Sequence, residues 1–108
     1  MAIQLVKLIY ATTASFPKEE MYGLTSQMRR AAVSVPSNIA EGAARGGTRE
    51  FVQFLTMARG SLSELETQIL IARELGYFKE AVDVDTLIEE LFRILGGLIA
   101  SLKAKHRQ

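Results

Sequence analysis

The stretch Arg29–Gly42, RRAAVSVPSNIAEG, decides how this chain folds, because it joins a helical apolar repeat to polar residues and a proline. Its apolar residues recur at the spacing of one helix face; they are Ala31, Ala32, Val35 and Ile39. Pro36 removes one backbone donor in the middle of that pattern. The apolar register continues across it, which predicts a single helix kinked at Pro36 instead of two helices.

A line of polar residues runs beside that apolar face at spacings of four, four and three: Arg30, Ser34, Asn38 and Glu41. A second polar line occurs later in the chain: Ser61, Glu64 and Gln68. Unpaired buried polar groups are costly, so we expect the two lines to face each other and exchange hydrogen bonds. Gly60 and Ser61 would let the backbones approach, and Arg30 would pair with Glu41 or Glu64. We interpret these residues as a structural network that fixes helix register or subunit contacts; a binding or catalytic cleft is the alternative.

The remaining pattern predicts an all-α fold, an antiparallel up-down-up-down four-helix bundle, because the connections between the long helices are short. The first helix is expected over 2–15 and the second over 24–44, with Thr25 or Ser26 as a cap. The third is expected to begin with Thr48 as its N-cap and to stop at Gly76. The fourth would be capped by Asp83 or Asp85.

Apolar stripes predict which side of each helix is buried. The first helix offers Ile3, Val6, Ile9 and Tyr10. The third carries a heptad-like seam typical of bundle packing: Phe51, Leu55, Ala58, Leu62, Leu65, Ile69 and Ala72. The fourth offers Leu87, Ile88, Leu91, Leu95, Leu98 and Leu102. Glycine is unfavourable inside a helix, so Gly96-Gly97 predicts a close approach of another helix there.

The composition indicates a single domain over residues 1–108 and narrows its chemistry. The chain has no cysteine, which excludes disulfides, cysteine-ligated metals and thiol catalysis and fits a cytoplasmic protein. The apolar run 94–102 is too short to span a membrane, and the N-terminus does not resemble a signal peptide. The one histidine, His106, has no Glu-x-x-His partner pattern, and no phosphate-binding loop is present. We therefore expect no enzyme activity, catalytic residue, metal or cofactor.

Charge is unevenly spread although the formal net charge is only +1. In an antiparallel bundle one end collects basic residues, which we predict to be the candidate nucleic-acid-binding site: Arg45, Arg49, Lys103, Lys105 and Arg107. A rim of this kind could hold phosphates of RNA or DNA in a salt-dependent way. The alternative is that basic residues near helix C-termini only complement the helix dipole. That alternative does not explain Arg49, which opens a helix.

Several stretches resemble one known family: 22–30 (YGLTSQMRR), 31–42, 50–55 and 58–67. The chain is similar there to the small bacterial four-helix bundle proteins named after intervening sequences in 23S ribosomal RNA genes. The resemblance implies a homo-oligomeric ring, commonly a pentamer, and no enzyme. The accessory proteins of diversity-generating retroelements look like the same bundle, and they form pentameric barrels that bind nucleic acid and a reverse transcriptase. Carrying that function to this chain is an analogy between folds.

Two functions follow as hypotheses. The first is an oligomeric scaffold that binds nucleic acid, or a protein that handles nucleic acid, through its basic end. The second is an oligomeric module for protein–protein interaction that binds no nucleic acid.

Overall fold

The computed structural model describes residues 1–78 and 84–106, which contain four α-helices and one short 3-10 helix and no strand. The elements are α1 (Ala2–Thr13), η1 (Lys18–Glu20), α2 (Leu24–Ala44), α3 (Thr48–Glu74) and α4 (Val84–His106). The prediction of an all-helical protein with four helices is therefore confirmed.

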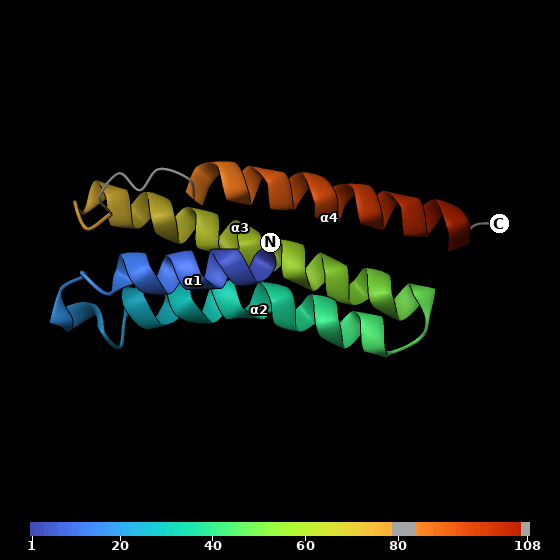
Figure 1. Cartoon of the computed structure of the whole chain (residues 1–108), viewed down its shortest axis with the longest axis horizontal. Coiled ribbons are helices and arrows are strands. Elements are labelled where there is room, and N and C mark those ends of the chain that lie inside the picture. Colours follow the sequence, from blue (N-terminus) through green and yellow to red (C-terminus); the bar gives the residue numbers. More distant parts are fainter. Residues whose placement is uncertain (79–83, 107–108) are drawn as a thin grey trace.

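The helices form an elongated body of 51 × 23 × 18 Å with α3 at its centre (Figure 1). The longest helix, α3, packs against α2 on one side and α4 on the other, while α1 packs mainly on α2. The turn from α2 to α3 and the C-terminal end of α4 lie at the same end of the molecule (Figure 1). The 12 residues of α1 cover only part of the length that the 27 residues of α3 span.

One apolar core runs through the bundle because each helix contributes a stripe of buried side chains. The largest of these side chains have less than 2% relative exposure, and α3 supplies Leu55, Leu62, Leu65 and Ile69. The other helices add Leu5 and Ile9 from α1, Met28 and Val35 from α2, and Val84 and Ile88 from α4. The predicted seam of α3 is thus buried, apart from Phe51, which is half-buried.

Two predicted stripes were partly wrong. On α1 the buried residues are Leu5, Ile9 and Thr13, while Ile3 and Tyr10 are 62% and 44% exposed. On α4 the buried stripe includes Val84 and Ile99, whereas Leu98 is 37% exposed.

The helix ends differ from the prediction in small ways. The first helix ends at Thr13, two residues early, while α2 has its predicted bounds and contains Pro36. Gly47, not Thr48, is the N-cap of α3. At the start of α2, the backbone N–H of Leu24 donates a 3.2 Å hydrogen bond to Oε1 of Glu20. The predicted cap by Thr25 or Ser26 does not form.

The two remaining end predictions concern α3 and α4. Gly76 adopts φ +78° just after α3, in agreement with the predicted glycine stop. Asp85 lies inside the first turn of α4, and Asp83 lies outside the described residues.

Among the helical glycines, Gly42 is the one that lies tightly against another helix, unlike the glycines expected from the sequence. A Cβ atom on Gly42 would lie 2.7 Å from Cβ of Phe54 and 3.0 Å from Cδ1 of Phe51. A Cβ atom on Gly60, Gly96 or Gly97 would meet no atom of another helix within 4 Å. The expected close approach at those three positions is therefore wrong, and the contact between α2 and α3 depends on Gly42.

Candidate nucleic-acid interface

The two predicted polar lines meet between α2 and α3 through three short side chains. Ser34 Oγ and Ser61 Oγ lie 2.8 Å apart, and either hydroxyl can donate. Asn38 Nδ2 donates to the backbone oxygen of Ser34 and to its Oγ, both at 2.8 Å. The Ser34–Ser61 hydrogen bond ties α2 to α3, and Asn38 holds Ser34 from within α2.

The charged members of the two lines are not part of that hydrogen-bonded group. Arg30 donates to Ser26 Oγ at 3.3 Å, and Glu41 pairs with Arg45, so the expected ion pair of Arg30 with Glu41 does not form. Arg30 and Glu64 line one shallow hollow between α2 and α3 but make no ion pair within the described residues. Both side chains are exposed and carry opposite charges there.

Gln68, the last member of the second polar line, is buried with 6% exposure. Its Oε1 atom has no hydrogen-bond partner in the described structure. Burial of an unpaired amide oxygen costs about 1–3 kcal/mol. Gln68 is therefore a polar residue that the core tolerates without a compensating contact inside the subunit.

Arg45, at the basic end, is held in place on two sides. Its Nε and Nη2 donate to Glu41 Oε2 at 3.2 and 3.0 Å, and its guanidinium lies 5.2 Å from the ring centroid of Phe54. Glu41 offsets part of its charge, and an exposed pair of this kind is worth less than about 1 kcal/mol. Arg45 therefore presents a fixed guanidinium beside an aromatic ring.

The other described residues of the basic end are exposed and surround the same end of the bundle. Arg49 lies in the first turn of α3, and Lys103 and Lys105 lie in the last turns of α4. Figure 1 places the end of α4 beside the turn that joins α2 to α3. Arg107 lies outside the described residues. The four described cations thus share one end of the molecule.

At the opposite end, the carboxylates of Asp85 and Glu20 accept hydrogen bonds from other side chains. Arg73 donates from Nη1 and Nη2 to the two carboxylate oxygens of Asp85, at 3.1 and 2.7 Å. Tyr77 donates its hydroxyl to Glu20 Oε2 at 3.2 Å. Partial burial, followed by the hydrogen bond to Glu20 and the charges of Glu20 and Glu19, raises the pKa of Tyr77 above its usual value. The first contact links α3 to α4, and the second links the loop after α3 to η1.

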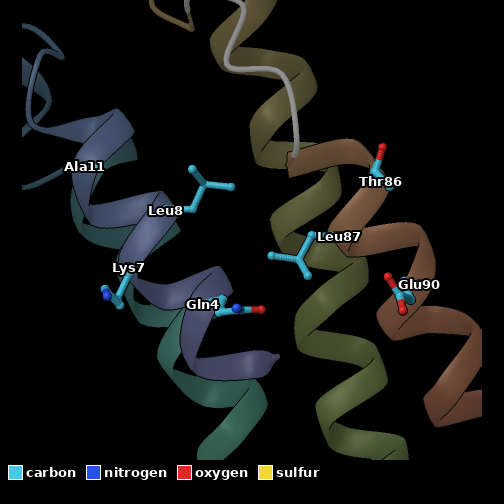
Figure 2. A pocket seen from close by; sticks show the side chains of 7 residues that line it. All are labelled: Gln4, Lys7, Leu8, Ala11, Thr86, Leu87 and Glu90. Carbon is cyan, nitrogen blue, oxygen red and sulfur yellow. The ribbon is translucent and has the colours of Figure 1, made fainter.

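A wide hollow opens between α1 and α4, where the short helix leaves its neighbour uncovered (Figure 2). Leu8 and Leu87 project into it from opposite sides. The remaining lining is a mixed set without a convergent acid and base: Gln4, Lys7, Ala11, Thr86 and Glu90. None of the predicted site residues lines this hollow.

Two further searches concern metals and membranes. Among residues 1–78 and 84–106, no cluster of three or more His, Asp or Glu side chains has the geometry of a metal site. In the same part of the chain, no helix combines the length and the apolarity needed to cross a membrane.

Sequence reasoning missed an aromatic and basic surface on α1 and α2. The guanidinium of Arg29 lies 4.6 Å from the ring centroid of Tyr10, and its Nε donates to Thr13 Oγ1 at 2.9 Å. Tyr22, just before α2, is 96% exposed. No spacing in the sequence indicates that Tyr10, Thr13 and Arg29 meet, because their contact depends on how α1 packs on α2.

Taken together, the fold and the site define a class of small helical bundle proteins whose polar signature residues join α2 to α3. A family model matches residues 1–98, and it describes the 23S rRNA-intervening sequence protein. The chain belongs to that family, as its sequence stretches suggested. A search of curated proteins found no match to this chain.

Proposed function

We propose that this protein is a non-enzymatic, homo-oligomeric scaffold that binds RNA or DNA through its basic end. The gathering of Arg45, Arg49, Lys103 and Lys105 at one end of the bundle carries this proposal. Cations that contact phosphates release counterions, so the affinity would fall steeply with salt. A ring of parallel subunits would repeat the basic end around one rim and so multiply its field.

Further features of this scaffold belong to the same proposal. The bundle is antiparallel, supported by the three-residue turn between α2 and α3, and α2 is kinked at Pro36, which cannot donate to the carbonyl of Ala32. The ring is a pentamer, as the family resemblance implies, and the cysteine-free sequence fits a location in the cytoplasm. The likeness to accessory proteins of diversity-generating retroelements supports nucleic-acid binding by analogy only.

Retention of labelled RNA and DNA on filters tests nucleic-acid binding. At low salt the wild type is expected to retain the label and to release it as salt rises. The double variant Arg45→Glu, Arg49→Glu is expected to lose at least ten-fold in affinity. The matched control is Lys7→Glu, Lys18→Glu, which makes the same change in net charge at exposed positions away from the basic end.

Two outcomes contradict the proposal. If the wild type retains neither RNA nor DNA at low salt, the protein does not bind nucleic acid, and the protein–protein module becomes the better hypothesis. If both double variants lose affinity equally, binding follows net charge and not the basic end.

A further inference from the structure

A group of exposed apolar side chains lies where α1, η1 and α2 meet. Tyr10, Met21, Tyr22 and Val33 are 44%, 49%, 96% and 39% exposed and line one shallow hollow together with Arg30. We call these five residues the tyrosine surface. Tyrosine, methionine and arginine are enriched at protein interfaces and in their energetic hot spots. Glu19 and Glu20 next to it make it less suited to phosphates than the basic end is.

A second group of exposed residues follows one side of α3. Glu64, Ile71 and Leu75 lie at spacings of seven and four, and Ile71 and Leu75 are 46% and 54% exposed. We call these three residues the α3 strip. Its carboxylate makes no ion pair within the described residues.

Contacts inside one subunit show that the two surfaces lie at matching levels along the bundle. The hydrogen bond between Ser34 and Ser61 places those two residues level with each other. α2 and α3 run side by side away from the three-residue turn that joins them, so counting back along α2 and forward along α3 both move away from that turn. Counting back 10 residues from Ser34 reaches Leu24, the first residue of α2 and two residues after Tyr22, and counting forward 10 from Ser61 reaches Ile71. Arg30 and Glu64 are level as well, because they line one hollow.

We infer that the tyrosine surface of one subunit seats the α3 strip of a second copy of this chain, with Arg30 bound to Glu64 of the partner subunit. In a ring closed by rotation about an axis parallel to the bundles, contacting residues of neighbouring subunits lie at the same level. This arrangement places the tyrosine surface against the apolar side chains of the α3 strip, and the guanidinium of Arg30 against the carboxylate of Glu64 of the partner subunit. This inference rests on the proposed homo-oligomer and names its interface.

Sedimentation velocity over a concentration series of the full chain tests the interface. Tyr22→Ser and Ile71→Ser are each expected to weaken self-association at least ten-fold, as loss of an anchoring side chain does. Ile94→Ser is the matched control for Ile71→Ser, since Ile94 is 42% exposed on α4, outside both surfaces. It is expected to change association less than two-fold.

A charge exchange tests the ion pair. Arg30→Glu and Glu64→Lys are each expected to weaken association, and the double variant is expected to recover most of the loss. Circular dichroism melting at the lowest concentration checks that each subunit still folds. Tyr22→Ser keeps the test valid if a charge variant unfolds, because a side chain that is 96% exposed adds almost nothing to the stability of a single subunit.

The results separate this interface from the rest of the proposed function. If the wild type assembles and the Tyr22, Ile71 and charge variants assemble equally well, the interface is wrong while the oligomer stands. If the wild type stays a monomer even at a concentration 100-fold above micromolar, the proposed oligomer and its interface are both wrong. Filter binding of nucleic acid then still tests the basic end by itself. Capture of a different protein by a monomeric wild type through Tyr22 would assign the tyrosine surface to that partner instead.

Discussion

Gly42 is the residue on which the contact between α2 and α3 depends most directly. A Cβ atom there would lie 2.7 Å from Cβ of Phe54, closer than side chains can approach, and the obstacle sits next to the backbone of α3. The helices must then separate, and a forced expansion of a packed core costs about 1–3 kcal/mol. The gain in helix propensity from glycine to alanine, about 1 kcal/mol, offsets only part of that cost.

Gly42→Ala is therefore expected to lower the free energy of unfolding by up to about 2 kcal/mol. Urea denaturation followed by circular dichroism measures this change. Gly60→Ala is the control, because a Cβ atom at Gly60 meets no atom of another helix within 4 Å. That variant is expected to be stabilised by up to about 1 kcal/mol. Equal stability of the two variants would show that the helices can separate at Gly42 without cost.

At the scale of the element, α2 is held to α3 by a small polar cluster inside an otherwise apolar contact. Ser34, Asn38 and Ser61 satisfy one another at 2.8 Å, which fixes the register of the two helices. An intramolecular hydrogen bond of this kind contributes about 0.5–1.5 kcal/mol net, and more is lost when one partner stays buried and unpaired.

A double-mutant cycle measures this contribution. Ser34→Ala and Ser61→Ala are each expected to destabilise the protein by about 1 kcal/mol, and the double variant by less than the sum. The coupling energy is obtained from urea denaturation of the four proteins. Thr56→Ala serves as the control, because Thr56 bonds only to the carbonyl of Val52 in its own helix. Additive losses for the two serines would mean that their hydroxyls do not interact in solution.

A feature of a helix could be predicted from the sequence where it depends on residues nearby in the chain, and not where it depends on contacts with another helix. The bounds of α2 and the glycine stop of α3 follow from neighbouring residues, and both agree with the structure. The buried side of α1 does not, because Ile3 and Tyr10 have the hydrophobicity of core residues but remain exposed once α1 packs on α2. Gly42 was likewise missed as a contact, since its role depends on Phe51 and Phe54 of another helix.

Over the whole molecule, the distribution of charge followed from the sequence once the helices were placed, whereas the pairing of individual charges did not. Arg45 pairs with Glu41 one turn away, an arrangement that helical spacing allows. Arg30 binds Ser26 instead of the expected carboxylates. Long exposed side chains choose among several partners of similar energy, so the spacing of residues alone does not select one.

The shortness of α1 has a consequence for the order in which the molecule opens. The hairpin of α2 and α3 is closed by a three-residue turn and is tied by the Ser34–Ser61 hydrogen bond. α1 has only 12 residues and leaves a hollow against α4. Native-state hydrogen exchange is therefore expected to show α1 amides exchanging through a partial opening, well before those of the hairpin. Equal protection of α1 and α3 would instead mean that the chain opens as one cooperative unit.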